Sequence, residues 1–435
     1  MAEIVKEQFE RIQMEVNLKS DKSAAMVASV GLPEEHPMTG YTVQGHGHSF
    51  VVLGAELSDD TTAFIRGKQQ RHERFFESLK QLNVHAAVIF TILRICGNPR
   101  LMYLCSVMIP DDNMKRLVSW FDAMVIEVLN GSALLRNHVK KHHLPRVYDT
   151  SGAGFTKYEK CYADLYVQAQ TAAIQGPAHT TPVALAQTNQ SLVQRKGAEH
   201  SAAGSWLFWT DTINGLTSAE FVMALGIRLG IALESGSIRL PTTCNCGKQV
   251  EETTLIEHSL TCDTFTTYGH VPRHNLVVDA LCRIARAYGI STTREPKYYT
   301  YDNEKRERPD ITFSGAPPTA TDATIVQTIG TVGANAKAAA RAKRKKHEDA
   351  VKKIGHVFHP FVLEATGFTD ESCVKMIDAI ADGNSMPRWL RFEFTRDMMH
   401  ATSIAMARGR ATALRIAVQR CIHAQVHALE YVGSE

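Results

Sequence analysis

Hydrophobic positions recur at two different spacings along this chain, and the changes of spacing predict its elements. Residues 3–17 place apolar side chains at roughly helical intervals among charges, which predicts an amphipathic helix. Residues 41–57 have instead the β-branched and aromatic bias of two strands around a His/Gly turn. From about 60 to 140 the helical period returns in several long runs, so this part is expected to form a bundle of three or four antiparallel helices.

Proline, glycine and small polar residues interrupt the helical pattern before the middle of the chain. A Pro/Gly-rich stretch around 141–160 ends the bundle, and a further helical run follows near 157–175. Residues 176–204 have the composition of a loose connection. The aromatic run Trp206–Trp209 is interpreted as a core anchor rather than a base-stacking surface, because clustered Trp and Phe usually bury. A helix over roughly 217–234 is expected next.

Beyond residue 264 helical and strand-like patterns alternate. The expected helices span 275–288, 334–354, 370–382 and 395–430, and the expected strands span 298–301, 309–314, 323–329 and 360–364. This order predicts an α/β domain with a short central sheet.

Composition narrows the class of protein. At 435 residues the chain is long enough for two to four domains that each bury a core. Its nine cysteines are an odd number spread along the chain, which favours a reducing compartment over a disulfide framework. Neither a secretory leader pattern nor a run of eighteen apolar residues is present, so we expect a soluble protein without a membrane partner. The net charge is only +3, yet basic residues crowd between Lys337 and Lys353, and such a block favours a polyanionic partner.

Three of the cysteines lie close together beside a histidine, in the pattern Cys244-x-Cys246-x11-His258-x3-Cys262. Three thiolates and one imidazole are the ligand set of a closed structural zinc site. The alternative is three buried cysteines and a surface histidine. We favour zinc because the segment is short and polar, and because Gly247 lets the chain fold back tightly over a metal ion.

Two aspartates follow this segment. Asp310 comes after Pro309 at the start of an expected strand, and Asp322 opens the next one, with a Gly/Pro-rich turn between them. Adjacent strands joined in this way bring both carboxylates to one point, where they can hold a divalent metal ion. Arg-Pro-Asp triplets also arise by chance, so the alternative is a solvated turn aspartate.

Several short segments carry a resemblance to a known family: Val51–Gly54, Leu93–Leu101, Phe121-Asp122, Leu144-Pro145 with Gly152 and Gly154, and Phe221–Gly230. With them the N-terminal half resembles the end of the palm, the helical thumb and the segment behind it in reverse transcriptases of non-LTR (LINE-type) retrotransposons. The C-terminal half is similar to the CCHC zinc knuckle and restriction-like endonuclease that close the polyproteins of the site-specific branch of these elements. The resemblance covers about residues 40–425.

The resemblance also shows what this chain lacks. The family's polymerase holds two metal ions with a Tyr/Phe-x-Asp-Asp hairpin, and that signature is absent from the sequence. The pairs Asp59-Asp60 and Asp111-Asp112 are not preceded by the aromatic strand that the hairpin requires. We therefore expect a chain that begins at Met1 to have no polymerase activity.

The resemblance implies roles for residues of the nuclease half. In restriction-like nucleases two acidic groups hold Mg²⁺ and a lysine assists the attacking water, which assigns the metal to Asp310 and Asp322. Threonine follows the second acid where common restriction enzymes carry lysine. The lysine is instead expected from the next helix, where Lys343-x-x-Lys346-His347 resembles the family's Lys-x-x-Lys-Tyr pattern. Which of Lys343 and Lys346 faces the metal stays open, and Glu364 is either a further ligand or a surface carboxylate.

Nucleic-acid contacts are expected from basic residues around these acids. The expected set is Arg273, His274, Arg308, Arg341, Arg344 and Lys345. Arg273-His274-Asn275 resembles the element that precedes the family's nuclease, although His274 is alternatively a helix-terminal histidine with no catalytic task. The basic helix is alternatively a solvated face.

The sequence thus predicts a mixed fold. Residues 1–60 are assigned to the end of a palm-like region, 61–175 to a helical thumb-like bundle, 176–240 to a linker and helix, 241–265 to a zinc knuckle and 266–435 to an α/β restriction-endonuclease-like domain. The expected function is a Mg²⁺-dependent, nuclear DNA endonuclease that nicks target DNA for target-primed reverse transcription, with target DNA and element RNA as partners. The alternatives are a non-catalytic nucleic-acid-binding remnant and a helical interaction protein of unrelated origin. The oligomeric state is not readable from the sequence.

Overall fold

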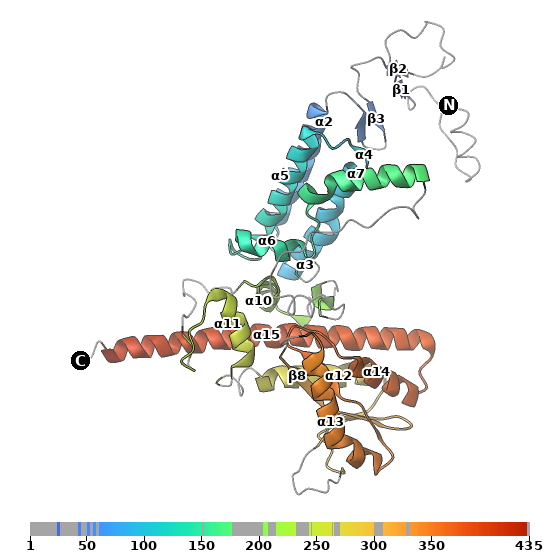
Figure 1. Ribbon diagram of the computed structural model, residues 1–435, viewed down its shortest axis with the longest axis vertical. Helices are drawn as coiled ribbons and strands as arrows, with labels where there is room; N and C mark the ends of the chain where they lie inside the picture. The colour runs from blue at the N-terminus through green and yellow to red at the C-terminus, as the bar shows by residue number, and fades with distance from the viewer. Residues whose placement is uncertain are drawn as a thin grey trace. The chain divides into compact units, whose positions relative to one another are not determined.

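The computed structural model describes residues 24–26, 42–44, 50–52, 55–57, 61–149, 152–175, 203–207, 215–231, 243–244, 246–262, 264, 270–299, 308–327 and 331–432. The chain divides into two compact units (Figure 1). Unit 1 consists of Met1–Glu77, Pro99–Met124 and Tyr158–Ala184, and unit 2 of Ser78–Asn98, Val125–Lys157 and Leu185–Glu435. The helix expected over 3–17 and the pair Asp59-Asp60 lie outside the described residues.

Unit 1 is mainly helical. It contains most of α2 (Thr62–Gln81) and α5 (Asp112–Leu129), with α4 (Met102–Val107), α7 (Tyr158–Gln175) and the short strands β1 (Ala24–Met26), β2 (Thr42–Gln44), β3 (Phe50–Val52) and β4 (Ala55–Leu57). Its core is aromatic, because the ring of Phe121 packs edge-on against Phe76 and Tyr158, with centroids 5.1 and 5.8 Å away. The predicted helices within 60–140 and 157–175 and the strand character within 41–57 are confirmed.

Two aspartates of unit 1 hold helix N-termini. Asp111 accepts a hydrogen bond of 2.7 Å from the backbone N–H of Met114 at the start of α5. Asp122 is buried and accepts bonds of 3.1 and 2.9 Å from the N–H groups of Tyr158 and Glu159 at the start of α7. A carboxylate at these positions satisfies orphan N–H donors and complements the helix dipole. The Asp111-Asp112 pair therefore serves α5.

One stretch, Ala86–Val107, is long and apolar enough to cross a membrane by length and composition. It is interrupted by a π-helical turn, Ile92–Gly97, and a 3-10 turn, Asn98–Leu101. Phe90, Leu93 and Leu104 within it are buried in the protein, as the side chains of a core helix are.

Unit 2 combines helices with a small mixed sheet. Its helices are α3 (Ala86–Thr91), α6 (Leu144–Tyr148), α10 (Ser218–Leu229), α11 (Glu252–Thr261), α12 (Val271–Ala287), α13 (Ala334–Lys352), α14 (Glu371–Gly383) and α15 (Arg388–Val432). Local sequence sets their ends, as α10 shows. Thr217 and Glu220 form a reciprocal capping box at its start, and Gly230 ends it with a φ of 78°.

The strands of unit 2 form a four-stranded sheet, β5-β6-β7-β9, and a separate two-stranded pair, β8 with β10. Its strands are β5 (Thr292–Arg294), β6 (Ile311–Phe313), β7 (Thr319–Thr321), β8 (Ala323–Val326), β9 (Val357–Phe358) and β10 (Phe361–Glu364). β5, β6 and β7 run antiparallel, whereas β7 pairs with β9 and β8 pairs with β10 in parallel. Both parallel pairs share one register, so Asp322 lies opposite Pro360, which has no N–H to donate. Along the chain, α12 is followed by β5, β6, β7 and β8, then by α13, and then by β9 and β10.

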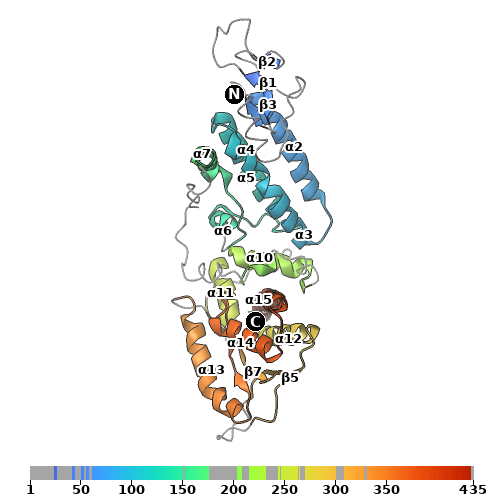
Figure 2. The same cartoon turned by 90° about the vertical axis from the view of Figure 1, so that its right-hand side faces the viewer.

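Helices cover both faces of this sheet (Figure 2). On one face Ile311, Phe313 and Phe361 join a core with α12, α14 and α15. On the other face α13 packs its alanines, Ala336 and Ala340, against Val362. The α/β character predicted beyond residue 264 is confirmed.

Most elements lie where the pattern predicts them, with a few differences. β7 forms in the stretch predicted as a Gly/Pro-rich turn, and α12 begins at Val271 rather than at 275. The strand expected over 298–301 is absent at 298–299, and the structure forms β5 upstream of Pro296 instead. Tyr299 is buried because it packs on Ala320 and Val351, which explains the misleading aromatic signal. α15 begins directly after Pro387, seven residues before its expected start at 395.

Candidate functional site

The three cysteines and the histidine of the predicted knuckle come together. The four ligand atoms of Cys244, Cys246, His258 and Cys262 all lie within 4.8 Å of one another. The sulfurs of Cys244 and Cys262 are 3.8 Å apart, and the sulfur of Cys246 is 3.3 Å from Nε2 of His258. A tetrahedron with Zn–S bonds of about 2.3 Å has S–S edges of about 3.8 Å. The cluster can therefore hold a metal ion such as zinc.

Local structure brings these ligands together. Gly247, with a φ of 83°, turns the chain so that its N–H donates to the carbonyl of Cys244. His258 lies on α11, and Cys262 ends that helix. Hydrogen bonding from the backbone N–H of Lys248 lowers the pKa of Cys246, which favours the thiolate that a metal binds. Cys244 and Cys262 pack with Leu255 of α11 against Leu414 of α15, so the cluster is tied to the core of unit 2.

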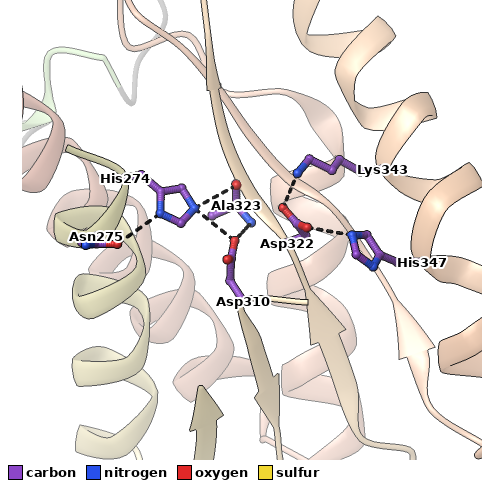
Figure 3. Close-up of polar contacts among 7 residues, drawn as sticks. All are labelled: His274, Asn275, Asp310, Asp322, Ala323, Lys343 and His347. Atoms are coloured by element: carbon purple, nitrogen blue, oxygen red, sulfur yellow. Dashed lines mark hydrogen bonds and ion pairs between the residues drawn. The ribbon is translucent and has the colours of Figure 1, made fainter. Parts of the chain in front are cut away.

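A second cluster forms at one end of the β6–β7 hairpin (Figure 3). Ile311 pairs with Thr321 across the hairpin, so Asp310 and Asp322 are the next residues outward on its two strands. Oδ2 of Asp310 accepts a hydrogen bond of 2.7 Å from the N–H of Ala323, which is adjacent to Asp322. The structure thus brings the Asp310 carboxylate to the backbone next to Asp322.

α13 holds both oxygens of Asp322. Nζ of Lys343 is 2.6 Å from Oδ1, and Nε2 of His347 is 2.8 Å from Oδ2 (Figure 3). Burial alone would raise the pKa of Asp322, but the hydrogen bonds from His347 and Lys343 and the lysine's charge outweigh it and lower that pKa. Asp322 is only 5% exposed and is held as a carboxylate by the hydrogen bond from Lys343 and the close contact with His347.

α12 contributes the other histidine. Nε2 of His274 lies 3.1 Å from Oδ2 of Asp310 and 3.2 Å from the carbonyl oxygen of Ala323. The hydrogen bond to Asp310 raises the pKa of His274, against the opposing effect of burial. His274 remains partly exposed and can meet a solute beside Asp310. Segments 273–275, 308–323 and 343–347 therefore converge on one site.

Glu364 does not belong to the cluster around Asp310 and Asp322. It is the last residue of β10 and pairs with Val326, so it is three positions along the strands from Ala323, about 10 Å away. Its side chain is fully buried, and Oε1 accepts a hydrogen bond of 2.8 Å from the N–H of Gly333 at the start of α13. Glu364 caps the helix that delivers Lys343 and His347, and it is neither beside Asp310 nor a surface carboxylate.

Arg273 does not fit the nucleic-acid contact predicted for it. Its side chain is 4% exposed, and Nη2 points to the carbonyl oxygen of Leu260 at 3.5 Å. A Cβ at Gly409 would lie 2.6 Å from its Cγ, so the arginine lies directly against α15. The residue is internal because α12 turns this face toward the core, while the neighbouring His274 faces Asp310.

The other basic residues lie at the surface to different degrees. Arg341, Lys345 and Lys346 are exposed on α13, whereas Arg344 and Arg308 are partly buried. The sequence left open whether Lys343 or Lys346 faces the two aspartates. In the structure, Lys343 contacts Asp322. The contact of His347 with Asp322 is missing from the predicted site set, although its place one helical turn after Lys343 could have indicated it.

No protein-family model matches the chain, and no curated protein is detectably similar to it.

Proposed function

We propose that unit 2 is a Mg²⁺-dependent DNA endonuclease of the restriction-like type, derived from a site-specific non-LTR retrotransposon. The observation that carries the proposal is the convergence of Asp310, Asp322, Lys343 and His274 on one hairpin end from three separate segments. A solvated turn aspartate would have no reason to gather these partners. The α/β part, a small mixed sheet with helices on both faces, is compatible with this proposal.

The donor set suits the metal. Mg²⁺ prefers carboxylate oxygens, and Asp310 and Asp322 supply them from neighbouring positions at the end of the β6–β7 hairpin, where Asp310 is partly exposed. When bound, Mg²⁺ would neutralise the scissile phosphate and lower the pKa of a bound water. Asp310 and Asp322 would be the residues that hold it.

The chain's own residues can perform the remaining tasks. The Lys343 ammonium group stands 2.6 Å from Asp322 and can orient a water or a phosphate oxygen there. His274 lies on the Asp310 side, where its Nε2 contacts Asp310 at 3.1 Å and the ring is partly exposed. Glu364 fixes the start of α13, and the His347 bond to Asp322 fixes its middle, so these two residues position Lys343.

α13 also offers a surface for the DNA backbone. Its buried face carries Ala336, Ala340 and His347, while Lys337, Arg341 and Lys345 lie exposed at intervals of four residues. Contacts from such a row to phosphates give affinity without sequence information. In this proposal the zinc cluster and the thumb-like helices guide target DNA and element RNA in the nucleus, during target-primed reverse transcription.

A second function has an observation in its favour. Both oxygens of Asp322 and Oδ2 of Asp310 already have partners within the chain, so the network is satisfied without an ion. A nucleic-acid-binding protein that has lost cleavage would keep such a network as structure.

Nicking of supercoiled plasmid in Mg²⁺ separates the two functions. We expect wild-type protein to nick, and Asp310→Asn and Asp322→Asn each to reduce the rate by more than about 100-fold, since each removes a metal ligand. Asp382→Asn is the matched control, because Asp382 is an exposed acid paired with Arg391 in the same unit. Zinc content confirms that each variant is folded. Wild-type binding of DNA without nicking would leave the non-catalytic function, and nicking by Asp322→Asn at the wild-type rate would refute the proposed centre.

A further inference from the structure

Three aromatic rings gather beside the β6–β7 hairpin. Tyr299 is buried, and its hydroxyl oxygen lies 2.9 Å from Oγ1 of Thr312 on β6 and 2.9 Å from Nδ1 of His356. The ring of Tyr298 packs against both neighbours, with its centroid 4.8 Å from that of Tyr299 and 6.0 Å from that of His356. Tyr299 and His356 therefore hold the Tyr298 ring in place.

Tyr298 differs from Tyr299 in exposure. Its side chain is 47% exposed, whereas Tyr299 is 6% exposed. Single apolar side chains are common on protein surfaces, so exposure alone does not indicate a site. An aromatic ring that is fixed by its neighbours and open to solvent is, however, the kind of platform on which a nucleobase stacks. The surroundings of Tyr298 decide between these two interpretations.

The path of the chain places Tyr298 close to the proposed metal centre. The backbone N–H of Glu295, which follows β5, donates a hydrogen bond of 2.9 Å to the carbonyl oxygen of Asp310. Tyr298 comes three residues after Glu295, and three residues span at most about 11 Å. Thr312, which contacts Tyr299, lies two positions after Asp310 along the chain. A nucleic-acid strand that meets Asp310 can therefore reach Tyr298 within a few nucleotides.

The exposed face of α13 leads to the same place. Val351 of α13 packs on Tyr299, and the helix ends at Lys352, four residues before His356. The exposed cations from 341 to 353 are Arg341, Lys345, Lys346, Lys352 and Lys353. In this described stretch Asp349 is the only exposed acid. A surface of this charge attracts phosphates, so it favours a nucleic acid over a protein as the partner of the Tyr298 ring.

We infer that Tyr298 stacks on an unpaired nucleobase of a strand whose backbone follows α13. An aromatic ring accepts any base in this way, because every base has a π-face. The bases of a duplex are stacked on one another, so only an unpaired or displaced base can occupy the Tyr298 ring. The inference rests on the proposed function for the course of the backbone along α13. It adds a feature of the substrate, which is an unpaired nucleotide close to the cut.

Binding of short oligonucleotides without Mg²⁺ tests the inference apart from cleavage. Fluorescence anisotropy compares a labelled oligothymidylate with a labelled duplex of equal length at fixed salt. Tyr298→Ala should weaken single-strand binding by about 10-fold or more and duplex binding by less than about 2-fold, because it removes stacking and keeps every cation. Tyr298→Phe should bind both like wild type, whereas Tyr298→Leu, which is apolar but not aromatic, should behave like Tyr298→Ala.

The matched control is Tyr103→Ala, which removes an exposed tyrosine of unit 1 and should change neither affinity. A photo-crosslink with wild-type protein reports the contact itself and does not depend on the folding of a variant. A single strand that carries 5-iodouracil should crosslink to Tyr298, which mass spectrometry of the digested protein identifies.

Two results would overturn the inference. One is equal single-strand affinity of wild type and Tyr298→Ala. The other is an equal loss of affinity for single strand and duplex in Tyr298→Ala, since stacking would then not be what the tyrosine contributes. The nuclease is tested separately: a protein that does not nick plasmid, but loses single-strand affinity selectively in Tyr298→Ala, would refute the cleavage centre and keep the stacking site.

Discussion

The two units of this protein bury ionisable groups in opposite ways. Unit 1 packs His72 against Phe121 in an aromatic core, where burial holds the ring neutral, and uses the buried Asp122 as a helix cap. Unit 2 buries Asp322 among a lysine and a histidine and places charged arginines in its interior. Burial of charge beside specific partners is costly and marks functional sites. The proposed function uses this difference, since it assigns the chemistry to unit 2.

Removal of metal should have the largest effect and should be confined to unit 2. Structural zinc contributes on the order of 10 kcal/mol to small folded sites. Without it, Cys244 and Cys262 lose what holds them beside Leu255 and Leu414, so the contact between α11 and α15 should open. We expect a chelator to raise hydrogen exchange in residues 246–262 and 411–418 and to leave α5 unchanged. Cys246→Ser should behave like the chelated protein, and equal protection with and without chelator would show that the cluster binds no structural metal.

Lowering the pH should reduce the stability of unit 1, because His72 becomes protonated. Burial, with the charges of Arg100 and Lys68, lowers the pKa of His72 to about 4. Because the folded pKa is below that of the unfolded chain, the contribution to stability is complete above about pH 6.5 and is lost as pH falls toward 4, by about 3 kcal/mol in total. Urea unfolding followed by Trp120, with the other tryptophans replaced by phenylalanine, measures it.

His72→Phe provides the control for this pH dependence. It keeps an aromatic ring against Phe121 and removes the titrating group. The slope of stability between pH 6.5 and 4 should flatten in this variant. A slope equal to that of wild type would assign the acid sensitivity to another group.

Glu364→Gln should separate a helix cap from a metal ligand. The amide keeps an acceptor for the N–H of Gly333 but loses the charge, so we expect a loss of about 1–2 kcal/mol in the stability of unit 2. The Mg²⁺ concentration for half-maximal nicking should stay at the wild-type value, since Glu364 lies away from Asp310. A large shift in that concentration would return Glu364 to the metal site.

A pair of glycine substitutions should give the smallest effects, of opposite sign in the two units. Gly67 lies within α2 with nothing near its Cβ position, so Gly67→Ala should stabilise by about 1 kcal/mol. Gly409→Ala in α15 should destabilise by about 1–3 kcal/mol, because its Cβ would meet Arg273. Thermal unfolding reports both, and stabilisation by Gly409→Ala would show that Arg273 moves aside freely.

Periodicity and spacing predict much of this structure. The metal ligands are readable because thiolates and imidazole at short intervals have few other uses, and α13 and β10 are readable because their patterns are strong. Asp310 and Asp322 come close through β7, which the pattern does not predict: this strand lies in the stretch interpreted as a Gly/Pro-rich turn, and its pairing with β6 places Asp322 next to the start of β6.

Tertiary packing decides the rest. Arg273 is buried while its neighbour His274 is partly exposed, because α15 covers the side of α12 that carries Arg273. No local sequence pattern contains the position of α15. Glu364 caps α13 across thirty-one positions of sequence. Tyr299 has the local character of a strand residue but is buried by partners distant in sequence.

Binding of Mn²⁺, a paramagnetic substitute for Mg²⁺, tests the central claim most directly, because it counts ions without a substrate. Electron paramagnetic resonance of the zinc-loaded protein should show bound Mn²⁺ that Mg²⁺ displaces. Asp310→Asn and Asp322→Asn should each abolish that signal, whereas Asp382→Asn should keep it. Equal Mn²⁺ binding by wild type and Asp322→Asn would contradict a metal centre at the hairpin end.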